Sequence, residues 1–433
     1  MPKSERYRRL AKEGFWIIFG QLLTVLGALV GVRLLTELLN PHAYGELALG
    51  MTIAILVNQI FLGPLAGGVT RFYAPAIENG DLTGYLNSAK QLLLYATAII
   101  IFVAIVAVIA MLVTGNVQWV PITVCALIFA IFNGYCANIS GIQSAARQRS
   151  IVALHQGADT LMRGLMAAGI ILWLGATSTF AMIGYAVSAT LVLVSQVVFL
   201  RKAISSQVNK RGDEKDWRAK IWRFSWPLGA FGIFTWMQLS SDRWALQIFS
   251  STKDVGNYAV LYQLGYYPIT LLTGMAMQFL EPILYQRAGD ASNSSRIAGV
   301  SRLSWQLVWL SLGVTGIAFL ATYFFHSQIF KLLVAEEYRA VSYMLPWLIA
   351  AGGVFASGQS LASLLLAHMK TRELMTVKII TAIFGVMLNF AGVYFFGITG
   401  IIYASVLFSV AYFIGMFLIV VDVNKNNIPV ENI

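Results

Sequence analysis

Long apolar runs separated by short polar segments recur along the whole 433-residue chain. Each run is about 20 residues long, which is the length that an α-helix needs to cross roughly 30 Å of hydrocarbon and is too long for a transmembrane β-strand. The pattern predicts twelve transmembrane helices. They fall near 15–39, 45–70, 90–113, 119–143, 152–174, 180–200, 222–249, 256–285, 303–325, 341–367, 374–396 and 398–421.

The composition agrees with this pattern. Hydrophobic residues make up 58% of the chain and charged residues only 11%, and the mean hydropathy is +0.72. These values lie far outside the range of soluble globular proteins. The sequence therefore predicts an all-α polytopic membrane protein.

The basic residues predict an orientation. If the N-terminus is cytoplasmic, 24 of the 30 lysines and arginines fall in cytoplasmic segments, as the positive-inside rule requires. The even helix count then places the C-terminus in the cytoplasm as well. This distribution explains most of the net charge of +11, so the charge gives no support to nucleic-acid binding.

Several short motifs occur twice and predict two pseudo-symmetric lobes of six helices. The arginine of Arg33-Leu34-Leu35 precedes Gly45 by twelve residues, and Arg243 precedes Gly256 by thirteen. Two six-helix halves insert with the same orientation, so an axis along the membrane normal should relate them around a central space. The predicted segments are a basic N-terminus at 1–14, an N-lobe at 15–200, a basic linker at 201–221, a C-lobe at 222–421 and a tail at 422–433.

Two prolines lie inside predicted helices at matching places in the two halves. Pro64 follows Gly63 in the second helix, and Pro268 follows Tyr267 in the eighth. Proline removes a backbone donor and frees a carbonyl, which permits a kink. We expect Pro64 and Pro268 to mark bends that serve gating.

No pattern of residues indicates catalysis. The sequence has no phosphate-binding loop for ATP, no closely spaced His/Cys metal set and no nucleophile elbow. We expect neither an enzyme nor a metal site, and no cofactor beyond a coupling ion.

The candidate chemistry lies in ionisable residues at membrane depth, where each costs about 2.5–3.5 kcal/mol to insert. His155, Asp159 and Arg163 are spaced four apart, so they share one helix face that should meet a neighbour or a water-filled cavity. Asp242 and Arg243 are adjacent and point about 100° apart, which argues against a simple mutual pair. Such groups either bind a ligand or pair to hold helices in register, and for Arg33 with Glu37 the structural interpretation is favoured.

The motifs together resemble those of the polysaccharide flippases in the multidrug/oligosaccharidyl-lipid/polysaccharide (MOP) exporter superfamily, whose fold is MATE-like. The residues that carry the resemblance are Arg33-Leu34-Leu35 with Tyr44-Gly45, Asp242-Arg243 with Val255-Gly256-Asn257-Tyr258, and Gly397-Ile398-Thr399-Gly400 with Tyr403-Ala404.

The resemblance implies that the protein flips an undecaprenyl-diphosphate-linked oligosaccharide, as for O-antigen, from the cytoplasmic to the outer leaflet of a bacterial inner membrane. It implies alternating access driven by Na⁺ or H⁺, and the polysaccharide polymerase and glycan assembly proteins as partners. Because guanidinium pairs with phosphate, Arg33, Arg163 and Arg243 are the expected headgroup partners. Asp159 or Asp242 is the expected carboxylate for the coupling cation.

Two alternatives remain open at this point. A MATE-like multidrug exporter would eject organic cations and predicts that Asp159, Asp242 or Glu281 stands unpaired in a cavity. A scaffold for glycan assembly would not transport at all, and the repeated intramembrane charges and paired prolines count against it.

Overall fold

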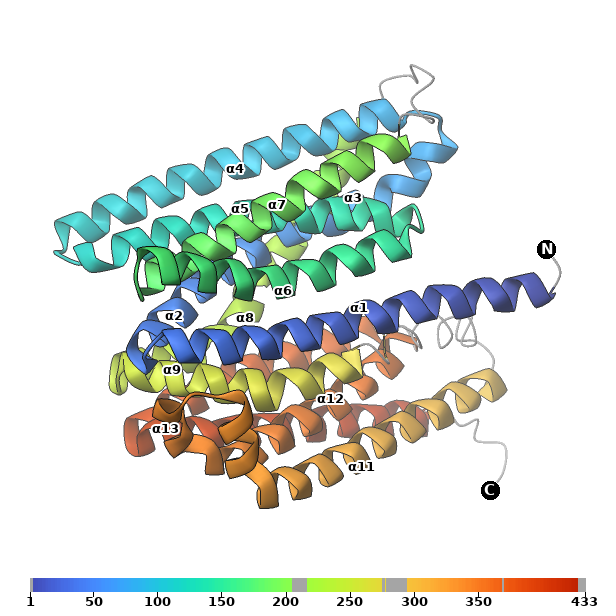
Figure 1. The fold of residues 1–433 in the computed structure, drawn as a ribbon. Coiled ribbons are helices and arrows are strands. Elements are labelled where there is room, and N and C mark those ends of the chain that lie inside the picture. Colours follow the sequence, from blue (N-terminus) through green and yellow to red (C-terminus); the bar gives the residue numbers. More distant parts are fainter. Residues whose placement is uncertain (1–2, 205–215, 275–276, 278–293, 368–369, 427–433) are drawn as a thin grey trace, which may run out of the picture. The chain divides into compact units, whose positions relative to one another are not determined.

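The computed structural model describes residues 3–204, 216–274, 277, 294–367 and 370–426 (Figure 1). Within these ranges the chain is built of helices joined by short turns, with no strand. Nine helical segments of this part are long and apolar enough to cross a membrane. The predicted class of an all-α polytopic membrane protein is confirmed.

The chain divides into two compact units, Met1–Trp236 and Met237–Ile433. In unit 1, the helices α5, α6 and α7 pack against one another, and α4 and α3 pack on α5 (Figure 1). The elements of unit 1 are α1 (Lys3–Leu38), α2 (Pro41–Val57), the π-helix η1 (Asn58–Leu62), α3 (Gly63–Glu78), α4 (Leu82–Val113), the 3-10 turn η2 (Val117–Trp119), α5 (Val120–Ala145), α6 (Arg149–Leu174), α7 (Ser178–Ile204) and the first part of α8 (Trp217–Phe249).

Unit 2 has α12 at its centre, in contact with both α11 and α13. The remainder of α8 leads into its other elements. These are α9 (Thr252–Leu261), the π-helix η3 (Tyr262–Tyr266) with helical residues 267–274 after it, α11 (Ser294–Leu333), the 3-10 helix η4 (Glu336–Met344), α12 (Leu345–Ala367) and α13 (Thr371–Asn426). Of the linker predicted at 201–221, residues 205–215 lie outside the described residues, and the lobe boundaries stay a prediction.

Some predicted helix ends were wrong. The helix predicted at 45–70 is three elements in succession and continues to Glu78. The last two predicted helices follow one another without a loop in α13. They meet at Gly397, whose φ of 57° and ψ of −137° are not helical. Glycine adopts this conformation without a steric penalty, so it permits a turn with no intervening loop.

Both predicted prolines directly follow a π-helix. Pro64 comes two residues after the end of η1, and Pro268 comes two residues after the end of η3. In each case the residue before the proline donates its N–H to the carbonyl five positions earlier, from Gly63 to Asn58 and from Tyr267 to Tyr262. A π-turn shifts the hydrogen-bond register just where proline has no N–H to give. This shared irregularity supports the predicted repeat, while the bend assigned to the prolines stays a prediction.

Helices α1 and α6 run parallel and pack closely, with glycines of both helices at the contact. A Cβ added to Gly27 would lie 2.7 Å from the backbone of Leu161, and one added to Gly164 would lie 2.7 Å from Gly31. Such small residues let helix backbones approach within a membrane. Since α1 and α6 are the first and fifth predicted spans, their parallel direction is what alternating spans require.

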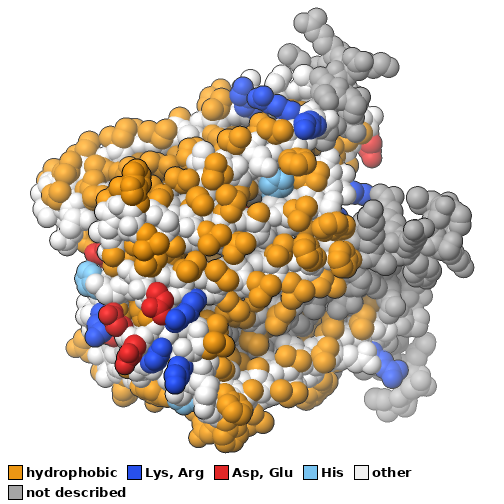
Figure 2. All heavy atoms as spheres, in the orientation of Figure 1, with side chains coloured by type: hydrophobic (Ala, Val, Ile, Leu, Met, Phe, Trp, Pro, Cys, Tyr) orange, Lys and Arg blue, Asp and Glu red, His pale blue; other side chains and the backbone are white. Residues whose placement is uncertain are grey.

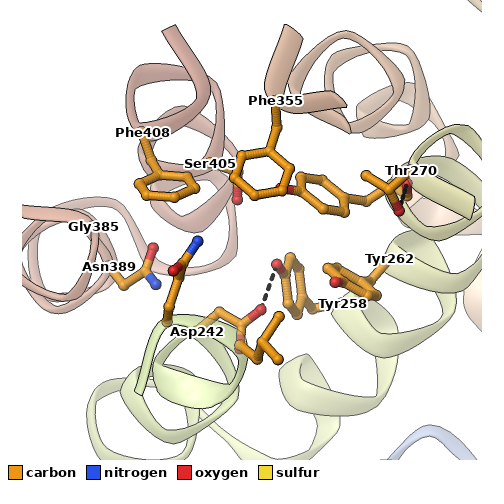
Figure 3. Close-up of a pocket in the computed structure, with 12 residues that line it drawn as sticks. Asp242, Tyr258, Tyr262, Thr270, Phe355, Gly385, Asn389, Ser405 and Phe408 are labelled. Carbon is orange, nitrogen blue, oxygen red and sulfur yellow. Dashed lines mark hydrogen bonds between the residues drawn. The ribbon is translucent and has the colours of Figure 1, made fainter. Parts of the chain in front are cut away.

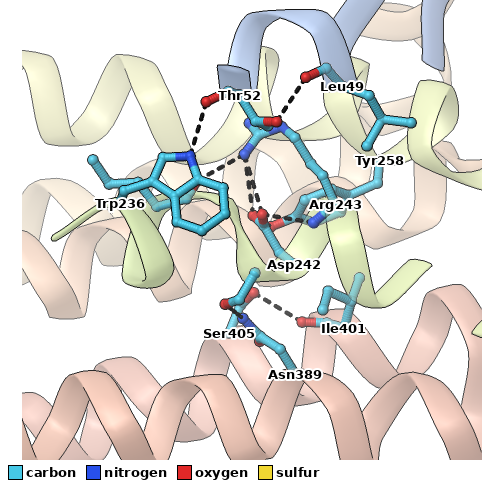
Figure 4. Close-up of polar contacts among 11 residues, drawn as sticks. Leu49, Thr52, Trp236, Asp242, Arg243, Tyr258, Asn389, Ile401 and Ser405 are labelled. Atoms are coloured by element: carbon cyan, nitrogen blue, oxygen red, sulfur yellow. Dashed lines mark hydrogen bonds and ion pairs between the residues drawn. The ribbon is translucent and has the colours of Figure 1, made fainter. Parts of the chain in front are cut away.

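The first part of α8 packs antiparallel along α2, η1 and α3. At one end, Trp217 donates its indole N–H to Asp81 at 2.8 Å, and at the other Trp236 donates to the carbonyl of Thr52 at 2.8 Å (Figure 4). Between them, Gly229 and Gly232 lie against the backbone carbonyls of η1. This contact explains why α8 as far as Trp236 belongs to unit 1.

Gly232→Ala is expected to lower the free energy of unfolding by about 1–3 kcal/mol, because the new Cβ would overlap the carbonyl oxygen of Gln59. Gly313→Ala on α11 is the matched control: a Cβ there meets nothing within 4 Å. It should stabilise the helix by up to about 1 kcal/mol. Thermal unfolding of both variants in detergent tests this, and equal melting temperatures would contradict it.

Hydrophobic side chains cover much of the surface. On the face drawn in Figure 2 they spread along the helices, while charged side chains gather towards helix ends. In the most apolar stretch of α4, only 11% is buried within the protein. This apolar exterior is the surface expected to meet lipid.

Candidate functional site

The predicted charged face of α6 contacts α5 and α7. Arg163 pairs with the carboxylate of Asp159 one turn away, and its Nη2 also donates to Asn133 Oδ1 at 2.8 Å. The guanidinium carbon lies 5.0 Å from the ring centroid of Phe129. His155 Nε2 lies 3.0 Å from Ser195 Oγ on α7. The prediction that this face meets a neighbour rather than lipid is confirmed.

The Asp159–Arg163 pair retains unused hydrogen-bonding capacity. Asp159 Oδ1 and Arg163 Nε are buried and have no hydrogen-bond partner among the described residues. Because a buried polar atom without a partner costs about 1–3 kcal/mol, these atoms are candidates for contact with water, an ion or a ligand.

Arg33 forms a separate pair on α1. Its Nη2 lies 2.5 Å from Glu37 Oε1, and the two side chains are 40% and 47% exposed. Gly31 lies against Gly164, so Arg33 is within about one helical turn, roughly 5 Å of axial rise, of the level of Arg163. The structure thus brings both arginines to neighbouring turns of packed helices, but each has its own carboxylate.

In unit 2, Asp242 and Arg243 do form an ion pair, so the interpretation that their divergent directions argue against a mutual pair was wrong. Arg243 Nη1 lies 3.1 Å from Asp242 Oδ1, and the side chains are only 11% and 9% exposed (Figure 4). The long arginine side chain folds back along α8, where Nη1 also donates to the carbonyl of Leu239 at 2.9 Å. The arginine side chain is long enough to reach Asp242 although the two Cβ atoms point in different directions.

Two tyrosines complete this site. The Tyr258 hydroxyl donates to Asp242 Oδ2 at 2.8 Å (Figure 3). The guanidinium carbon of Arg243 lies 4.8 Å from the ring centroid of Tyr262. Tyr262 stacks in turn on Tyr266, with ring centroids 5.0 Å apart. The tyrosines lie one turn apart on α9 and η3, so one helix face delivers all three.

A cavity of about 140 Å³ opens beside Asp242 within unit 2 (Figure 3). Asn389 and Ser405 from α13 line it with the tyrosines, and Asn389 Nδ2 donates to Ser241 Oγ at 2.8 Å. The site therefore combines one carboxylate, hydroxyls and an amide oxygen, a set of oxygens suited to a hard cation.

Sequence reasoning missed the uncharged members of both sites. Asn133 and Asn389 lie in long apolar runs, and a search for any strongly polar side chain at membrane depth, rather than for ionisable ones, would have found them. Pro64 is the second residue of α3 and Pro268 follows η3, so neither proline contributes to a charged pair.

Comparison with known proteins decides the family. A family model described as "Polysaccharide biosynthesis protein" matches residues 10–287. The chain belongs to this family. A search of curated proteins finds no match.

Three solved structures that are similar to this protein are those of two transporters and a flippase. A mutant of the MATE transporter VcmN of Vibrio cholerae has a TM-score of 0.64 at 14% identity, over 98% of each chain. The lipid II flippase MurJ, in an inward closed conformation, has a TM-score of 0.68 at 10% identity, over 95% of this chain and 87% of its own. A MOP superfamily transporter from Pyrococcus furiosus has a TM-score of 0.59 at 13% identity, over 96% of each chain.

At these identities the likeness shows the fold alone, and that fold is the one of the MOP superfamily. Together with the family match, it confirms the resemblance stated from the motifs. The protein is thus a member of the polysaccharide biosynthesis family with a polytopic all-α fold.

Proposed function

We propose that this protein flips a lipid-diphosphate-linked oligosaccharide, carried on undecaprenyl, from the cytoplasmic to the outer leaflet of a bacterial inner membrane. The observation that carries the proposal is that a member of the polysaccharide biosynthesis family holds a largely enclosed arginine in each unit, Arg163 with 24% and Arg243 with 11% of the side chain exposed. Each guanidinium lies over an aromatic ring and presents the fork of donors that matches phosphate oxygens.

In this proposal Arg163 and Arg243 each bind the diphosphate headgroup during translocation, and Arg33 receives or releases it nearer a membrane surface. The carboxylate partners keep the arginines neutralised while no cargo is bound, which lowers the cost of holding them at membrane depth. The hydrocarbon tail remains in the bilayer, so only the headgroup crosses.

Coupling to Na⁺ or H⁺ by alternating access is part of the proposal. Asp159 and Asp242 are the candidate carboxylates, and the oxygens of Asn389 and Ser405 beside Asp242 support a cation there. The polymerase and the glycan assembly proteins are the proposed partners, with O-antigen-type polysaccharide as the end product.

The second candidate is ejection of organic cations, as expected for a multidrug exporter. It predicts an unpaired carboxylate in a cavity. Asp159 and Asp242 are both paired with arginine, and Glu281 lies outside the described residues. The pairing favours the flippase, since an organic cation would need Asp159 or Asp242 unpaired, whereas a small coupling ion beside Asp242 can also bind the oxygens of Asn389 and Ser405.

Depletion of the protein in its native host tests the proposal. We expect mass spectrometry of polyprenyl-linked glycans to show a finished diphosphate-linked repeat unit accumulating on the cytoplasmic face, and re-expression should clear it. Unchanged lipid-linked glycans would refute the flippase, and efflux of organic cations would then be measured.

A further inference from the structure

A second, apolar groove lies in unit 1, away from both charged pairs. It has a volume of about 440 Å³ and is walled by α4, by the junction of η1 with α3, and by the first part of α8. Leu92 and Ile99 mark its extent on α4, and Trp222 and Ala230 mark its extent on α8. Since Trp222, Trp226 and Ile99 are exposed, the groove opens on the apolar surface of unit 1.

Unit 2 also has a groove of this kind, which is smaller. There the residues after η3 face α11, and the groove holds about 140 Å³. The lining positions on the outer wall are 92, 95, 96 and 99 on α4 in unit 1, and 307, 310, 311, 314 and 315 on α11 in unit 2, where Ser360 of α12 also lines the groove. Only in unit 1 does α8 add a third wall with two tryptophans, which makes the larger groove.

One end of the groove in unit 1 is basic. Because α8 runs antiparallel to α3, the end of α3 and the start of α8 lie at the same end of the groove. Arg71 is seven residues beyond Pro64 on the groove face of α3, and Arg218 is four residues before Trp222 on the groove face of α8. Both arginines are exposed.

The net charge of this end is positive. Among the described residues here there are five basic side chains and three acidic ones: Arg71, Lys90, Arg218, Lys220 and Arg223, and Glu78, Asp81 and Asp216. Of the acidic groups, Asp81 is buried and already accepts hydrogen bonds from Trp217 and Gly84. An anionic group at this end would therefore meet two arginines on the groove face, Arg71 and Arg218, which form no ion pair with any residue that the structure describes.

The length of the groove matches one leaflet. Leu92 to Ile99 spans roughly 10 Å and Trp222 to Ala230 roughly 12 Å at the helical rise. One leaflet of hydrocarbon is about 15 Å deep. The groove thus holds most of one acyl chain, whereas a polyprenyl chain would leave most of its length outside.

We propose that this groove binds an anionic membrane phospholipid, with one acyl chain between α4 and α8 and the phosphate group on Arg71 and Arg218. The apolar walls supply the hydrophobic contact, the tryptophans suit the interface region, and the arginines select the anionic headgroup. The bound lipid seals the contact of α8 with α3. This inference does not rest on the flippase function.

Native mass spectrometry tests it on the full-length protein equilibrated in nanodiscs of phosphatidylglycerol and phosphatidylcholine with identical chains. Wild-type protein should retain one phosphatidylglycerol in preference to phosphatidylcholine. Arg71→Gln/Arg218→Gln should lower this preference by roughly 30-fold, since each arginine contributes about a factor of five. Ala230→Trp or Ile99→Trp should fill the groove and reduce retention of both lipids.

Matched controls use the opposite faces of the same helices. Lys90→Gln/Lys220→Gln removes two charges about 160° from the groove, and Leu94→Trp adds an indole to exposed surface of α4. The lysine double should lower the preference for phosphatidylglycerol much less than the arginine double, because only the arginines lie on the groove face, and Leu94→Trp should leave lipid retention unchanged. Equal loss of selectivity in the lysine and arginine doubles would overturn the site. Displacement of phosphatidylglycerol by equimolar undecaprenyl phosphate would overturn the occupant, since it would make the groove a cargo-tail site.

Discussion

Alanine at both Arg163 and Arg243 is expected to reduce glycan export by on the order of 100-fold or more, because each charge-assisted contact to the diphosphate is worth roughly 1.5–3 kcal/mol. Lysine at the same positions should restore export only in part. Lysine keeps the charge but presents a point donor in place of the planar fork that binds two phosphate oxygens. The measurement is surface polysaccharide per cell at matched protein abundance.

Loss of Arg243 also leaves the carboxylate of Asp242 without a counter-charge. The export assay therefore needs variants in which both members of a pair are changed. Asp159→Asn/Arg163→Ala and Asp242→Asn/Arg243→Ala remove each pair as a unit and should fold better than the single arginine variants while exporting as poorly. Arg33→Ala, in the half-exposed pair with Glu37, should have a smaller effect. Unchanged export in the Arg163→Ala/Arg243→Ala protein at normal expression would sink the proposed roles.

Asp242→Asn is expected to lower the free energy of unfolding by about 3–5 kcal/mol, because it leaves the buried guanidinium of Arg243 without a counter-charge. The Tyr258 hydroxyl also loses its ionised acceptor. Thermal unfolding in detergent, followed by tryptophan fluorescence, should show a lower melting temperature than in wild-type protein.

Two variants separate this effect from a general loss of packing. Asp242→Asn/Arg243→Gln removes both charges and should recover much of the stability. Glu37→Gln breaks a pair of the same chemistry at a half-exposed position, where the expected cost is at most about 1 kcal/mol. If Asp242→Asn were no worse than Glu37→Gln, the pair would not be buried as the structure describes.

The helices were predictable because a membrane demands long apolar runs, and those runs are visible without knowing the packing. The irregular backbone was less so. A π-helix such as η1 changes the hydrogen-bond register without changing which residues are apolar. The periodicity of apolar residues therefore does not reveal it, although Pro64 follows it directly. Gly397 separates two apolar runs by a single residue, and its conformation makes the turn.

The candidate sites were predictable in their charges and not in their pairing. Arg163 and Asp159 are one turn apart, so a pair follows from helical geometry. Asp242 and Arg243 are neighbours in sequence, and their pair depends on an arginine rotamer that only the surrounding side chains select. Tyr258 and Asn389 reach the site from other helices, which the sequence does not place.

The division of α8 between the units has a consequence for how the chain is assembled during synthesis. The glycine contacts with η1 and the indole hydrogen bond to Asp81 come from residues 217–236, beyond the sixth predicted span. Because an emerging chain folds from its N-terminus, the first six spans insert before α8 is made. Until then, the face of α2, η1 and α3 that contacts α8 is uncovered. The start of the second half of the chain then completes the first unit, so a fragment cut within residues 205–215 would lack a wall of its own core.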